Sequence, residues 1–109
     1  MLTQEEIQTV DTEVEKLRRA SGIKGFYPSF LTKGLQLKET DVVGYLDTEG
    51  MEKHGLRHRY VLHDEDMVMV GEYANLEDVP QDEMVENSYG EEVYVGENWH
   101  MVKYIFNRN

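Results

Sequence analysis

Seven carboxylates and no lysine or arginine lie in one short stretch of the chain, "LEDVPQDEMVENSYGEE", at residues 76–92. Carboxylates at this density can keep a surface hydrated, bind a cation, or present negative charge to a basic partner. The acids of this stretch are Glu77, Asp78, Asp82, Glu83, Glu86, Glu91 and Glu92. The other potential ligands and the charge of the whole chain help to choose between these roles.

Histidines are the other candidate metal ligands, and the chain has four of them: His54, His58, His63 and His100. The segment around His54 and His58 is interpreted as a turn entering a strand, where residues four apart are separated by about 13 Å. A site built from His63, His100, Asp64 and Asp66 has no supporting spacing, and "DTEGME" and "DEDM" lack the twelve-residue calcium pattern. We therefore predict no metal site and no cofactor.

Catalytic motifs are also lacking. Ser21, Ser29 and Ser88 have no glycine-elbow setting, and no glycine-rich phosphate loop is followed by a lysine. The chain contains no cysteine, which excludes thiol nucleophiles, disulfides and Cys-ligated zinc. Carboxylate pairs are too abundant to single out an acid/base couple, so we predict that the protein is not an enzyme and has no catalytic residues.

Charge is divided unevenly along the chain, whose formal net charge is −11. Residues 61–100 contain twelve acids and no lysine or arginine, whereas residues 16–38 contain six bases and no acid. The bases are Lys16, Arg18, Arg19, Lys24, Lys33 and Lys38. Blocks of this kind create a field that attracts oppositely charged partners and weakens as salt is added.

Three interpretations of this polarity remain open. The acids can be a solvated surface, neutralised in part by the basic block in the folded chain. They can instead imitate nucleic-acid phosphates, so that a groove built for DNA or RNA accepts this protein. The stretch "IKGFYPSFLTK" at residues 23–33 has the composition of a base-stacking platform, but the net charge opposes direct binding of nucleic acid.

One helix and several strands are expected to position these residues. Thr3 and Glu6 form a capping box, an apolar stripe (Ile7, Val10, Val14 and Leu17) follows, and Gly22 is a stop signal. Residues 22–34 are interpreted as a packed crossing loop, and residues 74–90 as a long loop with a helical turn at residues 81–86. Strands are predicted at Val42–Asp47, Leu56–Leu62, Met67–Tyr73, Glu92–Val95 and Trp99–Phe106. The second and third strands are expected to form one antiparallel hairpin, and the last two another.

This order predicts one α+β domain over residues 1–109, with an N-terminal amphipathic helix packed on a four- to five-stranded antiparallel sheet. Five strands span about 24 Å, whereas one helix is about 10 Å wide, so the helix cannot cover the sheet. Both faces of the Met67–Tyr73 and Trp99–Phe106 strands are apolar. The second face must be covered by the aromatic loop at Phe26, Tyr27 and Phe30, by curling of the sheet, by a second copy or by a partner.

The sequence therefore predicts a small acidic binding protein, an inhibitor or antagonist of a basic nucleic-acid-handling protein such as a nuclease or phage-defence effector. Immunity proteins and phage counter-defence proteins share its charge and size, which is an analogy and not a match of motifs. Partner binding is assigned to the seven acids of residues 76–92, with Tyr89, Tyr94 and Trp99 as aromatic anchors. The alternative is a self-associating assembly protein, such as a homodimer, that uses an apolar sheet face. The acidic, non-apolar start predicts a cytoplasmic protein without a membrane segment.

Overall fold

The first helix begins at the predicted capping box. In the computed structural model, which describes residues 1–107, α1 spans Gln4–Arg19. The Thr3 hydroxyl accepts a hydrogen bond from the Glu6 amide at 3.2 Å, and the Glu6 carboxylate accepts one from the Thr3 amide at 2.8 Å. Val10 and Val14 are buried, so the apolar stripe is the packed side of the helix. No helix among residues 1–107 has the length and apolar character needed to cross a membrane.

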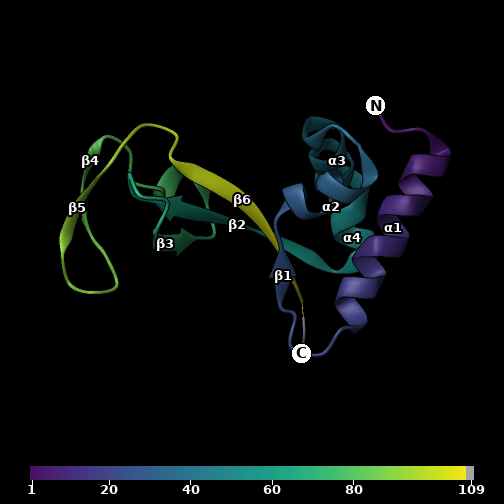
Figure 1. Cartoon of the computed structure of the whole chain (residues 1–109), viewed down its shortest axis with the longest axis horizontal. Helices are drawn as coiled ribbons and strands as arrows, with labels where there is room; N and C mark the ends of the chain where they lie inside the picture. The colour runs from purple at the N-terminus through teal and green to yellow at the C-terminus, as the bar shows by residue number, and fades with distance from the viewer. Residues whose placement is uncertain (108–109) are drawn as a thin grey trace. The chain divides into compact units, whose positions relative to one another are not determined.

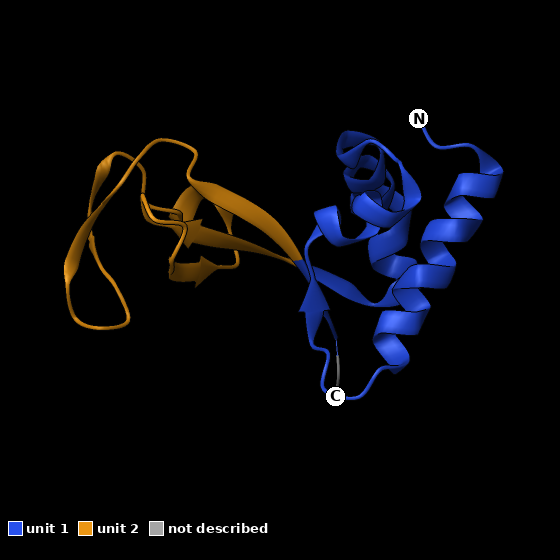
Figure 2. Ribbon diagram, in the orientation of Figure 1, with its two compact units in different colours: residues 1–57, 104–109 blue, residues 58–103 orange. Residues whose placement is uncertain are grey.

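The chain divides into two compact units (Figure 2). Unit 1 contains residues 1–57 and 104–109, and unit 2 contains residues 58–103. The strands β2 (Leu56–His63) and β6 (His100–Phe106) contribute residues to both units. The prediction of a single domain stays a prediction.

Unit 1 contains all four α-helices of the described chain (Figure 1). After α1 come β1 (Gly25–Phe26), α2 (Pro28–Leu35) and α3 (Glu39–Tyr45). The last of these continues through a π-helical turn, η1 (Leu46–Gly50), into α4 (Met51–His54), which Gly55 ends with a φ of 61°. The buried side chains of this unit include Val10, Val14, Leu31, Val42 and Leu46.

Two sequence predictions for this region are wrong. Residues 22–34 are not an irregular crossing loop, because they contain β1 and most of α2. Residues 42–47 are not a strand: they lie in α3 and η1. The Val42–Val43 pair favours a strand locally, but Val42, Tyr45 and Leu46 share one helical face and are all buried, so packing overrides that preference.

The sheet is antiparallel, with four strands in the order β1-β6-β2-β3, where β3 spans Met69–Tyr73. Gly25 pairs with Ile105 and Phe26 with Tyr104, while Tyr60 of β2 pairs with Tyr73 of β3. The predicted α+β class and the four-stranded antiparallel sheet are thus confirmed, as is the hairpin of the second and third predicted strands.

The last predicted hairpin is wrong. β5 (Glu92–Val95) pairs with β4 (Glu83–Glu86) in a separate two-stranded sheet, and not with β6. Residues 74–90 accordingly contain a 3-10 turn, η2 (Leu76–Asp78), and the strand β4 where a helical turn was expected. The turn between β4 and β5 favours this pairing. The Asn87 side chain accepts hydrogen bonds from the amides of Tyr89 and Glu91, and Gly90 has a φ of 80°.

Unit 2 has its own small core. Leu62, Val79 and Val95 are buried, and five partly buried side chains pack against them: Tyr60, Val70, Tyr73, Val85 and Trp99. Gly96 makes room for the indole, because a Cβ there would lie 2.4 Å from Trp99 Cε2. Of the aromatic loop, Phe26 packs on Tyr104 and Phe106 in unit 1, and Phe30 is 61% exposed. Met67 and Met69 remain exposed in unit 2, so the described chain leaves these two side chains uncovered.

Candidate functional site

The acidic and basic blocks of the sequence belong to different units of the fold. Unit 2 contains twelve carboxylates and two basic side chains, Arg59 and Lys103, which give it a formal charge of −10. Unit 1 contains ten carboxylates and nine basic side chains, a formal charge of −1. The six bases of residues 16–38 all lie in unit 1. Within unit 2, Arg59 and Lys103 are the bases available to offset its twelve carboxylates.

Two acids of α1 lie close to bases of the same helix. Lys16 lies 3.1 Å from Glu13, and Arg18 lies 3.7 Å from Glu15. In unit 2, Lys103 reaches Glu72 at 3.9 Å. Two bases cannot offset twelve acids, so unit 2 has a large excess of negative charge.

The hairpin of β4 and β5 holds part of this surface. Met84 is opposite Tyr94, and Glu86 is opposite Glu92, so these four side chains share one side of the ribbon. We call them the hairpin face. Met84 is 56% exposed and Tyr94 47% exposed, and both glutamates are exposed. Like charges directly opposite each other, such as Glu86 and Glu92, destabilise an antiparallel strand pair. The hairpin face therefore combines an unfavourable charge pair with the exposed apolar area of Met84 and Tyr94.

All ten predicted partner-binding residues lie in unit 2, but not on one face. Glu77 and Asp78 are on η2, Tyr89 is 79% exposed in the β4–β5 turn, and Glu91 is exposed beside it. Glu86, Glu92 and Tyr94 belong to the hairpin face, whereas Glu83 is opposite the buried Val95. Asp82 precedes β4, and Trp99 is partly buried against the unit 2 core.

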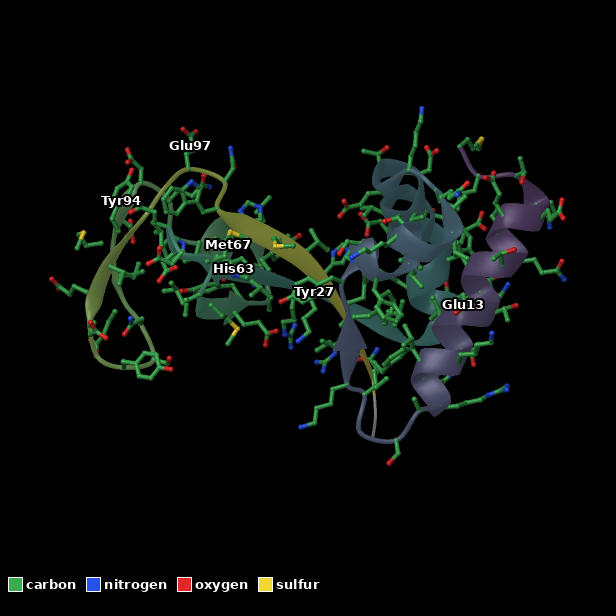
Figure 3. The ribbon with its side chains drawn as sticks, viewed as in Figure 1. Glu13, Tyr27, His63, Met67, Tyr94 and Glu97 are labelled. Carbon is green, nitrogen blue, oxygen red and sulfur yellow. The ribbon has the colours of Figure 1, made fainter. Side chains whose placement is uncertain are left out.

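Tyr94 is held in place by two neighbours. Its hydroxyl donates a short hydrogen bond to Asp82, and its ring meets Trp99 edge-on with the centroids 5.8 Å apart. The hydrogen bond to Asp82 is the main cause of a raised Tyr94 pKa, so the hydroxyl keeps its proton. Figure 3 shows Tyr94 and Glu97 among the side chains of unit 2. A fixed, exposed tyrosine is suited to act as an anchor.

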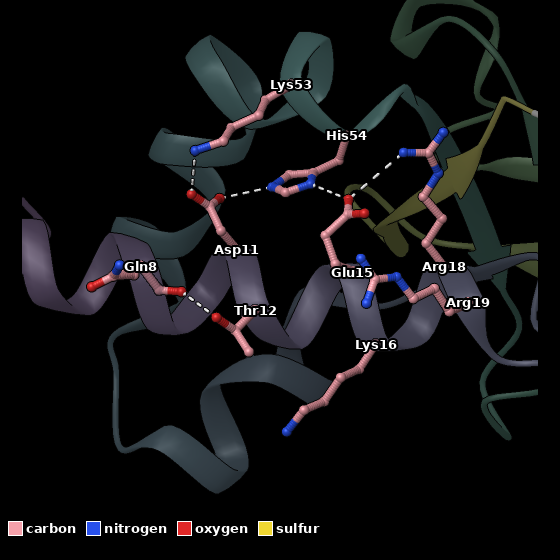
Figure 4. Close-up of a pocket in the computed structure, with 9 residues that line it drawn as sticks. All are labelled: Gln8, Asp11, Thr12, Glu15, Lys16, Arg18, Arg19, Lys53 and His54. Atoms are coloured by element: carbon pink, nitrogen blue, oxygen red, sulfur yellow. Dashed lines mark hydrogen bonds and ion pairs between the residues drawn. The ribbon is translucent and has the colours of Figure 1, made fainter.

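A second constellation, in unit 1, was missed by the sequence analysis. His54, at the end of α4, is 2% exposed and lies between two carboxylates of α1 (Figure 4). Its Nε2 is 2.7 Å from Asp11 Oδ1, and its Nδ1 is 2.6 Å from Glu15 Oε2. Asp11 also accepts from Lys53 at 2.6 Å and from the Tyr45 hydroxyl at 2.6 Å. We call these five residues the His54 cluster.

The His54 cluster joins α1 to α4 through His54 and Lys53, and joins α1 to α3 through Tyr45. Burial raises the pKa of Asp11, but hydrogen bonds from Lys53, Tyr45 and His54 outweigh it and leave that pKa lowered. The His54 hydrogen bond likewise lowers the pKa of Glu15, and burial raises that of Tyr45.

These lowered values predict how unit 1 responds to acid. A carboxyl whose folded-state pKa lies below its unfolded value stabilises the fold above the unfolded value and loses that effect as the pH falls through the folded pKa. We expect the free energy of unfolding to decrease from about pH 5 downward as Asp11 and Glu15 protonate. Urea denaturation followed by helical circular dichroism at a series of pH values measures this. In Asp11→Asn the decrease should be shallower; an equal slope in the variant would contradict the assignment.

The signal for the His54 cluster is present in the sequence but is not local. Asp11 and Glu15 are four residues apart, which places them on one face of α1. His54 is about forty positions away, and the sequence analysis treats its segment as a turn entering a strand. The turn is at Gly55 and the strand begins at Leu56, whereas His54 itself belongs to the helix. Within residues 1–107, no group of three or more His, Cys, Asp or Glu is arranged to hold a metal ion.

The helices α2 and α3 of unit 1 follow each other in the element order of a helix-turn-helix. α2 and α3 contact each other and are joined by Gln36–Lys38. In DNA-binding proteins of this kind the second helix enters the major groove, where phosphates surround it. Here the second helix and its continuation to His54 contain one lysine, Lys53, and five acids: Glu39, Asp41, Asp47, Glu49 and Glu52. That charge opposes contact with phosphates.

Comparison of the chain with protein-family models, curated proteins and solved structures finds no match. Function is therefore argued from the residues alone.

Proposed function

We propose that this protein is a non-catalytic binding protein that inhibits or antagonises a basic, nucleic-acid-handling protein such as a nuclease or a phage-defence effector. The observation that carries the proposal is the concentration of charge: unit 2 has a formal charge of −10 in 46 residues and two bases of its own. Such a surface attracts a groove lined with lysine and arginine, which is how DNA and RNA are held. We place this activity in the cytoplasm, where a cysteine-free chain is at no disadvantage.

Further support comes from the hairpin face. Glu86 and Glu92 are opposite each other, an arrangement that costs stability within the free protein. A pair of like charges that costs stability in the free protein is characteristic of a position used in function. In a basic groove the same two carboxylates would each gain a cation, and Tyr94 beside them would add apolar contact.

A second candidate function is self-association. Met67, Val68 and Met69 are 66, 46 and 53% exposed, and a run of apolar side chains on the surface favours burial against another molecule. In a homodimer built on these residues, however, the unit 2 of each copy would carry a formal charge of −10 at the contact. The repulsion between copies favours a basic partner, and self-association would require salt to screen it.

Affinity capture tests both candidates. The immobilised protein is exposed to lysate of its source, and of organisms with which its source interacts, at about 50 mM and about 500 mM salt; the Debye length falls from about 14 Å to about 4 Å. We expect a basic nucleic-acid-binding protein to be retained at low salt and depleted at high salt. Recovery of the protein itself, increasing with salt, would instead favour self-association and contradict the antagonist role.

A further inference from the structure

A cavity in unit 2 lies between the turn after β2 and the start of β6. Its volume is about 320 Å³, and its walls are mostly apolar. The residues that matter for its chemistry are His63, Glu65, Met67, Trp99, His100 and Met101. The His63 amide donates to the Trp99 carbonyl at 3.1 Å, which fixes the two sides of the cavity relative to each other. Figure 3 shows His63 and Met67 close together.

Three ring nitrogens of the two histidines that line this cavity are buried and have no hydrogen-bond partner within residues 1–107. Both ring nitrogens of His63 and Nδ1 of His100 are buried and unpaired. A buried polar atom without a partner is unfavourable and rare in folded proteins, so three at one cavity call for a partner that the free chain does not supply. His63 and His100 both line the cavity and are partly buried as residues.

The backbone at the rim is also unusual. Met67 has a φ of 65° and Asn98 a φ of 62°, both in the left-handed region. Asparagine tolerates this conformation, but methionine does not favour it. Hydrogen bonds from the Asp66 and Val68 amides to the Asp64 carboxylate hold this turn, and Met67 remains 66% exposed at the cavity wall. Glycine would be the least strained residue at Met67, so the methionine side chain is retained at a conformational cost.

We infer that this cavity accepts an arginine side chain of the basic partner, an inference that rests on the function proposed above. An arginine has an apolar stem, which Met67 and Met101 can cover, and a flat guanidinium, which can stack on Trp99. Its N–H groups can donate to the exposed Glu65 carboxylate and to a ring nitrogen of His63 or His100 that becomes accessible on binding. An anionic ligand is opposed by the charge of unit 2, and a purely apolar one leaves the histidines unpaired.

Peptide binding tests the inference directly. Trp99 is the sole tryptophan, so its fluorescence reports on this cavity in the full-length protein. The probes are two nine-residue peptides, one with three arginines and one with three lysines in the same positions. We expect the arginine peptide to bind roughly tenfold more tightly, since lysine offers neither the planar stack nor the forked donors. Equal affinity for the two peptides would overturn the inference.

Two matched variants locate the binding. Met101→Lys and Met84→Lys change the charge equally at exposed strand methionines, but only Met101 lines the cavity. Met67→Gly removes a cavity wall at a position where glycine relieves the backbone. We expect Met101→Lys and Met67→Gly to abolish the preference for arginine, with Met67→Gly at least as stable as the wild type. Retention of the preference in both variants would overturn the inference.

The cavity and the proposed function can fail separately. If the peptides bind alike and Met101→Lys behaves as Met84→Lys, the arginine inference is wrong even when a basic protein is captured in a salt-sensitive way. If the arginine preference is present but no basic protein is captured at either salt concentration, the cavity binds arginine, but the proposed function and the assignment to a basic partner are wrong. Capture of a second copy through an arginine of unit 1 would also overturn the assignment to a basic partner.

Discussion

Replacing His54 with alanine is expected to lower the free energy of unfolding by about 2–4 kcal/mol. The substitution leaves a cavity between α1 and α4, and it removes the ring that contacts both Asp11 and Glu15. The cost is below the value for a fully buried ion pair, because the side chains of Asp11 and Glu15 are 14 and 31% exposed and can regain water. His54→Gln keeps donor groups of similar size and should recover part of the loss.

Chemical denaturation with two probes measures this effect. The α-helices of the described chain are all in unit 1, which circular dichroism follows, and Trp99 fluorescence follows unit 2. The control is His58→Ala in the half-buried part of β2, with an expected cost below about 1 kcal/mol. Equal destabilisation by the two alanine variants would contradict the role assigned to the His54 cluster. Coincident transitions from the two probes would support the predicted single domain, and separated ones would oppose it.

Neutralising the acids of the β4–β5 hairpin is expected to slow association with the captured partner while leaving the free protein equally or more stable. The variant carries glutamine at Glu83, Glu86 and Glu92. The association rate constant at low ionic strength should fall roughly three- to tenfold, and its dependence on salt should flatten. Because Glu86 and Glu92 repel each other across the hairpin, the free energy of unfolding should rise by about 0.2–1 kcal/mol.

A matched triple variant separates local from global charge. Glutamine at Glu39, Glu49 and Glu52 changes the net charge by the same amount, but these exposed residues lie in unit 1. Stopped-flow or surface-based kinetics over a range of salt concentrations compares the two variants. If both slow association equally, the charge of the whole chain steers the encounter and the hairpin is not the contact surface. Asp82 is left unchanged in this design, because it holds Tyr94 in place.

Local signals in the sequence were sufficient for several elements. The capping box at Thr3 and Glu6 predicts the start of α1, and both of its hydrogen bonds lie within three residues. The strands β2 and β5 were predicted from β-branched and aromatic residues bounded by turns. The helix α3 was missed because its Val42–Val43 pair favours a strand, and only burial against the rest of unit 1 shows that its apolar residues form a helical face.

Strand partners were not determined by local signals. The last two predicted strands are neighbours in the sequence and were expected to form a hairpin. Instead β5 pairs with β4 through the Asn87–Gly90 turn, and β6 pairs with β1 from the N-terminal third of the chain. Pairing depends on which apolar faces can be buried together, and that involves residues far apart in the sequence.

The sequence by itself determined the amount and the sign of the charge in residues 61–100, since side-chain ionisation at neutral pH depends mainly on residue type. Tertiary structure decided the rest. It placed the acidic residues 61–100 and the basic residues 16–38 in different units, Glu86 opposite Glu92, and His54 between Asp11 and Glu15. It also joined His63 and Met67 to Trp99 and Met101 around one cavity. Contacts of this kind follow from the burial of apolar area across the whole chain, which no short window of sequence specifies.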